Sequence, residues 1–349
     1  MYGRRRRRVL LGAVLAALLA NTASPARHLP NDKPPAQRQA THAQQGRTYP
    51  SAVRWPQQGQ GALVLGNGRP AASPDQQPVP IASLAKVMTA YLLLQRYPLD
   101  GVQDGFTITV TAAQAQAAAQ AAAQDESFVA VRAGEQLTER QLLEALLIAS
   151  GNNVARMLAA LLTGSETSFL AEMNAEARAL GLDHTIYTDP SGFDPGTVST
   201  AADQLRVFQQ AMRFQVFRQI VSMASVTLPV AGTVTNFNPL IAEGYGGKTG
   251  SDSAAGGCLA FSTDVTVGGR RLTAVGVVMG QGEGSDTSAI LAAAGRAATQ
   301  LVDSVSGSDR PNHGSLGSPR GPASIDEDSA NDRANRVSAT RILRGSSAS

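Results

Sequence analysis

The chain has 349 residues, of which 43% are hydrophobic and 16% are charged, and it contains a single cysteine. This is enough apolar material for one sizeable core, and a single cysteine excludes an internal disulfide. The formal net charge of +3 would fall by five to −2 without the arginines at 4–8, so the overall charge gives no indication of nucleic-acid binding.

The N-terminus has the three-part layout of a secretory signal. Arg4 to Arg8 precede an apolar run from Val9 to Ala20, and small residues follow up to Ala26. The run is shorter than the roughly 20 apolar residues that a bilayer-spanning helix needs. We therefore expect export to the extracytoplasmic cell envelope or the medium, with cleavage after Ala26. The alternative is an uncleaved signal, which would then be the only attachment to the membrane.

The segments that flank the predicted folded unit have no apolar periodicity. Residues 27–47 are rich in Pro, Gln, Asn and Thr, and residues 304–349 are rich in Ser, Gly, Pro, Asp and Arg. Such compositions favour disorder, because they offer too little apolar surface for burial. The predicted organisation is a signal peptide at 1–26, a disordered linker at 27–47, one folded domain at 48–303 and a disordered tail at 304–349.

Strands open and close the predicted domain, and helices occupy its middle. Residues 62–65 form a short apolar run before a Gly-Asn-Gly turn, and an apolar helical run follows at 81–95. Thr138 and Gln141 have the spacing of a capping box, and Thr200 starts another helix. Three consecutive strands within 248–279 and a final helix at about 286–302 complete the domain.

This order of elements predicts the α+β class. The architecture that satisfies it is an antiparallel sheet packed by helices, with a helical subdomain beside the sheet and a cleft between the two. The segment 111–124 is almost entirely Ala and Gln, which have high helix propensity but little side chain to bury. We expect an exposed helical insertion there and assign it no function.

Ser83 and Lys86 form the first candidate reactive pair. Residues three apart share a helix face, so the amine of Lys86 would lie beside the hydroxyl of Ser83. A lysine in a dry pocket has a lowered pKa and can take the serine proton, which activates the serine as a nucleophile. The pattern also occurs in ordinary helices, but the apolar residues around this one indicate a central helix.

Two further motifs are ambiguous when each is taken alone. Ser150 and Asn152 can relay a proton and hold a peptide, or they can simply end a helix. Lys248 and Thr249 can receive a carboxylate while Gly250 lets substrate backbone approach closely, or the three can form an ordinary turn into a strand. In this order and combination, the three motifs indicate a penicillin-recognising serine enzyme.

Other chemistries are disfavoured by what the sequence lacks. Of the four histidines, only His184 lies in the predicted domain, so a Ser-His-Asp triad would have to use it. A metal site with several His or Cys ligands is disfavoured for the same reason. No Gly-x-Ser-x-Gly elbow and no phosphate-binding loop that ends in Lys-Ser/Thr occur. We therefore expect no metal and no cofactor.

Over about 48–303 the chain resembles the low-molecular-mass D-alanyl-D-alanine carboxypeptidases, which are serine-type penicillin-binding proteins. The resemblance rests on IASLAKVMTA at 81–90, VRAGE at 131–135, LLIASGNN at 146–153, TDPSGFD at 188–194, STAAD at 199–203, GKTG at 247–250 and AGGCL at 255–259. It implies a β-lactamase/transpeptidase-like fold, peptidoglycan stem peptides as substrates and β-lactam antibiotics as covalent inhibitors, with no nucleic acid as a partner.

The resemblance also implies a role for each motif residue. Ser83 would be the nucleophile, Lys86 its base, and Ser150 the group that passes a proton to the leaving amine. The implied substrate-binding residues are Asn152, Lys248, Thr249, Gly250 and Ser251, the last through a backbone N–H that shares an oxyanion hole with that of Ser83.

Three alternatives stay open at this point. A D,D-endopeptidase of the same fold is poorly separated from a carboxypeptidase by sequence. A class A β-lactamase would carry Ser-Asp-Asn where this chain has Ser150-Gly151-Asn152. An inactive wall-binding protein belongs to a different functional class, and the three intact motifs disfavour it.

Overall fold

The computed structural model describes residues 53–123 and 126–306. The predicted signal peptide, the linker, the first residues of the predicted domain and the tail beyond 306 lie outside the described residues. Among the described residues, no helix is long and apolar enough to cross a bilayer.

The described strands are β1 (Gln60–Leu65), β2 (Ala71–Ala72), β3 (Val79–Pro80), β4 (Thr107–Thr109), β5 (Gln136–Thr138), β6 (Val198–Ser199), β7 (Ser225–Leu228), β8 (Gly232–Thr235), β9 (Gly246–Asp252), β10 (Gly256–Val267) and β11 (Arg270–Gln281). The α-helices are α1 (Ala85–Arg96), α2 (Ala112–Ala123), α3 (Glu139–Leu147), α4 (Asn152–Thr163), α5 (Glu166–Ala179), α6 (Ala201–Ala211), α7 (Gln215–Val221) and α8 (Thr287–Val305). Two short 3₁₀ turns are η1 (Ala82–Leu84) and η2 (Ile241–Glu243).

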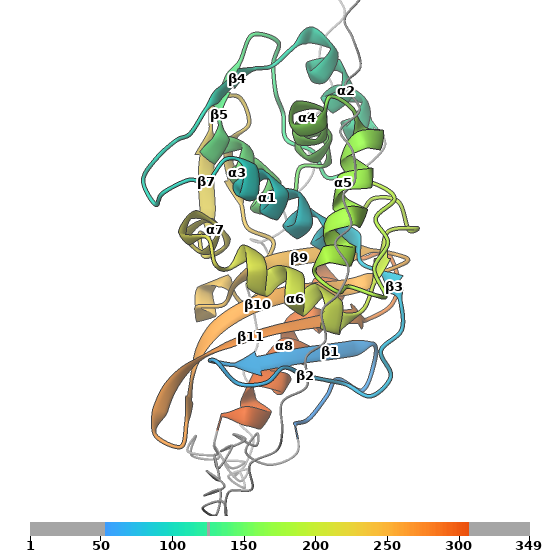
Figure 1. The fold of residues 1–349 in the computed structure, drawn as a ribbon, viewed down its shortest axis with the longest axis vertical. Helices are drawn as coiled ribbons and strands as arrows, with labels where there is room; N and C mark the ends of the chain where they lie inside the picture. Colours follow the sequence, from blue (N-terminus) through green and yellow to red (C-terminus); the bar gives the residue numbers. More distant parts are fainter. Residues whose placement is uncertain (1–52, 124–125, 307–349) are drawn as a thin grey trace, which may run out of the picture. The chain divides into compact units, whose positions relative to one another are not determined.

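The main sheet is antiparallel and has the strand order β2-β1-β11-β10-β9 (Figure 1). Its side chains alternate between two apolar layers, as the pleat requires. Leu63 and Leu65 of β1 pack in the layer that α8 covers, while Ala62 and Val64 join the core shared with α1 and α6. The sheet therefore lies between α8 and the other helices, and β9 forms its edge toward the helical part (Figure 1).

Helix α1 is the centre of the helical part. All of its residues from Ala85 to Leu94 are buried, and it contacts α3, α4, α5 and α6. The predicted helix starts are confirmed: Thr138 and Gln141 form a reciprocal capping box, and the Thr200 side chain accepts from the N–H of Asp203. These caps satisfy backbone groups that would otherwise be unpaired where each helix begins.

Two expectations about helices need correction. The Ala/Gln-rich segment does form a helix, α2, but it is not simply exposed. Most of α2 is exposed, but Ala118 and Ala121 are buried, and the helix contacts α4. Helix α8 ends at Val305, whose side chain is fully buried. The predicted domain end at Asp303 therefore falls inside a packed helix.

Candidate active site

Ser83 lies in the turn that leads into α1, with its hydroxyl beside the amine of Lys86. The two atoms, Ser83 Oγ and Lys86 Nζ, are 2.7 Å apart. Ser83 belongs to the 3₁₀ turn η1 and not to the α-helix itself, but a spacing of three residues still puts both side chains on one face. The residue before it, Ala82, has φ = +44°, a conformation that non-glycine residues rarely adopt and that is often found at active sites.

Lys86 is fully buried behind Ser83. Its Nζ also donates to the carbonyl oxygen of Ser191, at 2.9 Å. Burial lowers the pKa of Lys86 well below its usual value, and the positive charge of Lys248 lowers it further. A lysine in these surroundings loses its proton readily, so it can accept one from the adjacent serine hydroxyl.

The segment from Ser150 to Asn152 joins α3 to α4. Ser150 has φ = +58°, the second positive value at a non-glycine residue among the described ones, and its hydroxyl lies 3.0 Å from Nζ of Lys248. Asn152 is the first residue of α4, and its Nδ2 donates to Oε2 of Glu126 at 3.0 Å. The buried Oδ1 of Asn152 has no hydrogen-bond partner among the described residues. This connection therefore separates two helices and also turns polar groups inward.

Strand β9 carries the third motif on the edge of the sheet. Lys248 is buried, and its Nζ donates to the hydroxyl of Ser150 and to the carbonyl of Thr249. Burial lowers the pKa of Lys248 to about 7. A cation can therefore be present here near neutral pH.

Gly250 has a structural reason in addition to the role expected for it. A Cβ at this position would lie 2.8 Å from the carbonyl oxygen of Ile81 and 3.2 Å from the backbone nitrogen of Ser83. The absent side chain thus lets β9 pack directly against the turn that holds Ser83, and close approach of substrate backbone is not needed to explain the glycine.

The three motifs meet at one cleft, which brings together elements far apart in the chain. Its described lining residues are Ser83, Ser127, Ser150, Phe237, Thr249, Gly250, Ser251, Thr287 and Leu291. Of the residues expected from the sequence, Lys86, Asn152 and Lys248 lie buried behind this lining. His184 does not line the cleft; it is exposed, and its backbone N–H donates to Asp203.

Several residues around the cleft were not predicted from the sequence. Phe237, Thr287 and Leu291 come from segments without a recognisable motif, and Glu126 lies two residues beyond the Ala/Gln-rich segment. Asp189 and Ser191 lie in the TDPSGFD stretch, which supported the resemblance but received no role. The resemblance of that stretch to the family was the signal that could have indicated a role for Asp189 and Ser191. Local periodicity gives no indication that the stretch lies beside α1.

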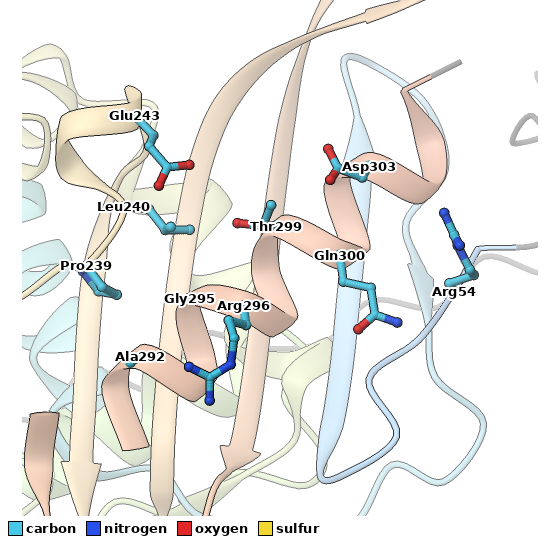
Figure 2. Close-up of a pocket in the computed structure, with 10 residues that line it drawn as sticks. All are labelled: Arg54, Pro239, Leu240, Glu243, Ala292, Gly295, Arg296, Thr299, Gln300 and Asp303. Atoms are coloured by element: carbon cyan, nitrogen blue, oxygen red, sulfur yellow. The ribbon is translucent and has the colours of Figure 1, made fainter. Parts of the chain in front are cut away.

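A larger hollow of about 630 Å³ lies along α8, on the side of Leu240 and Glu243 (Figure 2). Side chains of both charges border it, among them Arg296 and Glu243, over a floor that includes Pro239 and Leu240. It contains no pair of a hydroxyl and a buried amine like that at Ser83, so the smaller cleft is the candidate active site. No group of three or more His, Cys, Asp or Glu side chains within the described ranges is suited to hold a metal ion.

The profile of the D-alanyl-D-alanine carboxypeptidase family, peptidase S11, matches residues 71–282. The chain belongs to this family. The matched span contains all three motifs, and membership makes the chain a serine-type peptidase. The resemblance expected from the sequence is therefore confirmed.

Curated relatives of this S11 peptidase carry two kinds of name. The D-alanyl-D-alanine carboxypeptidase DacB2 of Mycobacterium tuberculosis is 36% identical over 60% of this chain and 70% of the relative. A D-alanyl-D-alanine endopeptidase of Pseudomonas aeruginosa is 31% identical over 54% of this chain and 60% of the relative. The names agree on the D-alanyl-D-alanine bond and differ in the kind of peptidase.

Solved structures support the same fold for this S11 peptidase. The crystal structure of the Streptomyces K15 DD-transpeptidase superimposes with a TM-score of 0.60 at 25% identity, over 72% of this chain and 98% of that one. The expected α+β fold, an antiparallel sheet packed by helices with a helical subdomain, is confirmed by this likeness and by the sheet and helices described above.

Proposed function

We propose that this S11 peptidase is a D-alanyl-D-alanine carboxypeptidase that removes the terminal D-alanine from peptidoglycan stem peptides through an acyl-enzyme on Ser83. The observation that carries the proposal is the 2.7 Å separation between the Ser83 hydroxyl and the fully buried amine of Lys86. A neutral amine at that distance is a general base already in hydrogen-bond contact with the nucleophile.

In the acylation step, Ser83 Oγ attacks the carbonyl carbon between the two D-alanines while its proton passes to Lys86 Nζ. The peptide C–N bond then breaks, and the leaving amine receives a proton through Ser150. Asn152 holds the peptide, and the cation of Lys248 with the Thr249 hydroxyl binds the terminal carboxylate. This assignment requires a positive Lys248 beside a neutral Lys86, and mutual repulsion of two buried lysines favours that unequal state.

The carbonyl oxygen becomes negative as the tetrahedral intermediate forms. Two backbone N–H groups, those of Ser83 and Ser251, are the proposed donors to it, and Gly250 brings their two segments together. Each donor of this kind contributes about 3 kcal/mol to the transition state. Water then attacks the ester and returns Ser83 to its free form.

Penicillins should react at the same serine. Ser83 Oγ would add across the β-lactam C–N bond, which opens the ring without loss of atoms, so the adduct carries the mass of one intact penicillin. Incubation followed by mass spectrometry of a digest tests this. Label on a peptide that contains Ser83, and its absence from the Ser83→Ala variant, is the expected result; label on another serine would refute the assignment.

A D,D-endopeptidase is the second candidate, because the relative from Pseudomonas aeruginosa carries that name. Digestion of purified cell-wall fragments separates the two. A carboxypeptidase releases free D-alanine from pentapeptide stems, whereas an endopeptidase converts cross-linked dimers to monomers without releasing D-alanine.

The proposed function places the enzyme outside the cytoplasm, in the cell envelope or the medium. Support comes from the sequence of residues 1–26, which has the layout of a secretory signal. N-terminal sequencing of the mature protein tests it: a first residue at Arg27 is expected, and an intact Met1 would indicate retention as an anchor.

A further inference from the structure

The loop between α5 and β6 holds a buried carboxylate, Asp189, close to the candidate base. Only 7% of Asp189 is exposed. Its two oxygens accept from the backbone N–H groups of Ser191, Gly192, Phe193 and Asp194 and from the hydroxyls of Ser191 and Thr197. No ion pair within the described residues involves Asp189, so backbone and hydroxyl dipoles alone compensate its charge.

The turn wrapped around Asp189 contacts α1 and η1 at three points. The carbonyl of Ser191 accepts from Nζ of Lys86 at 2.9 Å, and the carbonyl of Pro190 accepts from the hydroxyl of Thr89 at 2.7 Å. Gly192, at φ = +79°, lies against the turn before Ser83, since a Cβ there would come within 1.8 Å of the carbonyl oxygen of Ala82. The shape of this turn therefore decides where Lys86 and Ser83 meet.

We propose that Asp189 is a positioning residue for the base: it folds the turn that holds the Ser191 carbonyl against Lys86, and its buried negative charge acts on the lysine amine. The inference rests on the proposed function, in which Lys86 takes the proton of Ser83. Asp189 itself touches neither substrate nor the reacting atoms.

The negative charge of Asp189 raises the pKa of Lys86. The groups that act electrostatically on Lys86 are Lys248 and Arg156, which lower its pKa, and Asp189 and Glu126, which raise it. Of the two anions, Glu126 is paired with Arg156 at 2.9 Å, whereas Asp189 has no cationic partner in the described part of the chain. Asp189 thus moderates the fall in the pKa of Lys86 that burial causes.

The test is the rate of acylation by a fluorescent penicillin, measured against pH, in Asp189→Asn. This variant removes the negative charge and puts an NH₂ group in place of one Asp189 oxygen that accepts hydrogen bonds. We expect the maximal rate to fall by about tenfold or more through misplacement of the turn. We also expect the acid limb of the profile to move to lower pH, because the pKa of Lys86 falls when a nearby anion is removed.

Two further variants distinguish the effect of Asp189 on the shape of the turn from the effect of its charge on Lys86. Ser191→Ala keeps the carboxylate but removes the hydroxyl that donates to Asp189 Oδ2 at 2.5 Å, so the maximal rate should fall several-fold with the acid limb unmoved. Asp194→Asn is the matched control: this exposed carboxylate of the same loop accepts from the N–H of Gly196, and its loss should change neither quantity.

An acid limb that stays in place or moves to higher pH in Asp189→Asn would overturn the charge effect. If Asp189→Asn does not fold, as judged by its melting curve, an unchanged maximal rate in Ser191→Ala overturns the positioning role. The parent enzyme distinguishes failure of the proposed function from failure of this inference. Absence of a Ser83 adduct in the parent refutes the proposed function. A labelled parent, with a folded Asp189→Asn variant that changes neither the maximal rate nor the acid limb, refutes this inference alone.

Discussion

Replacement of Lys86 by arginine tests the central step of the proposed mechanism. Arginine keeps a positive charge on a long side chain, but its guanidinium stays protonated at any pH at which the protein is folded. If Lys86 must be neutral to take the proton from Ser83, Lys86→Arg lacks a base. General base catalysis contributes about 10²- to 10⁴-fold, so acylation should slow by about that factor.

The structure allows a matched control at the second lysine. Lys248 is buried like Lys86, and its proposed role is to supply a cation that need not titrate. Lys248→Arg should therefore acylate within about tenfold of the parent at its best pH, since only the geometry of carboxylate binding changes. Equal losses in the two variants would mean that arginine is simply too large for these buried positions.

The pH dependence sharpens the same comparison. Burial lowers the pKa of Lys248 to about 7, and a lysine is a cation only below its pKa. In the parent, kcat/KM for a peptide should rise with pH as Lys86 loses its proton and should fall above about pH 7 as Lys248 loses its charge. Lys248→Arg stays cationic, so the fall at high pH should disappear.

The assay is the rate of acylation by a fluorescent penicillin from pH 5 to 10, with melting temperatures as the folding control. Lys86→Met, which is uncharged and of similar length, should lose acylation as fully as Lys86→Arg. If a folded Lys86→Arg variant acylates within about tenfold of the parent, Lys86 is not the base, because an arginine at that position cannot accept the proton.

The remaining predictions concern stability and the walls of the cleft. Burial raises the pKa of Glu139 to about 7, so the folded state holds a proton there more tightly than the unfolded chain does, and stability should fall as pH rises from about 4.5 to 7. Glu139→Gln should remove this dependence and stabilise the protein at pH 8 by up to about 3 kcal/mol in denaturant titrations, with no gain at pH 4. Gly192→Ala should destabilise the fold by about 3 kcal/mol or more, because its Cβ would overlap the carbonyl of Ala82; a melting temperature equal to that of the parent would contradict the structure. Phe237→Ala should raise KM for peptide substrates with little change in kcat, because this half-exposed ring lines the cleft without touching the reacting atoms; an unchanged KM would remove it from the binding surface. Truncation after Ser306 should leave activity and melting temperature unchanged, whereas truncation after Asp303 should lower the melting temperature, because it removes the buried Val305.

Local patterns were enough for much of the fold. The apolar run at 62–65, the capping box of Thr138 and the N-cap of Thr200 are properties of a few neighbouring residues, and each predicted its element correctly. The Ala/Gln-rich segment forms the expected helix and is mostly exposed, but two of its residues are buried. Helix propensity is local, but burial of Ala118 and Ala121 depends on α4, which lies later in the chain.

The family and the α+β class could be predicted from motifs and from the order of elements. The pairing of Ser83 with Lys86 could also be predicted, because a spacing of three residues puts two side chains on one helical face whatever surrounds them. Only the tertiary structure placed Ser150 against Lys248, 98 residues away, and the Ser191 carbonyl against Lys86, 105 residues away. The tertiary structure also explains the glycines at 250 and 192, where a Cβ would collide with the backbone of another segment. Contacts of this kind leave no periodic trace, since they depend on how the whole chain packs and not on the residues beside them.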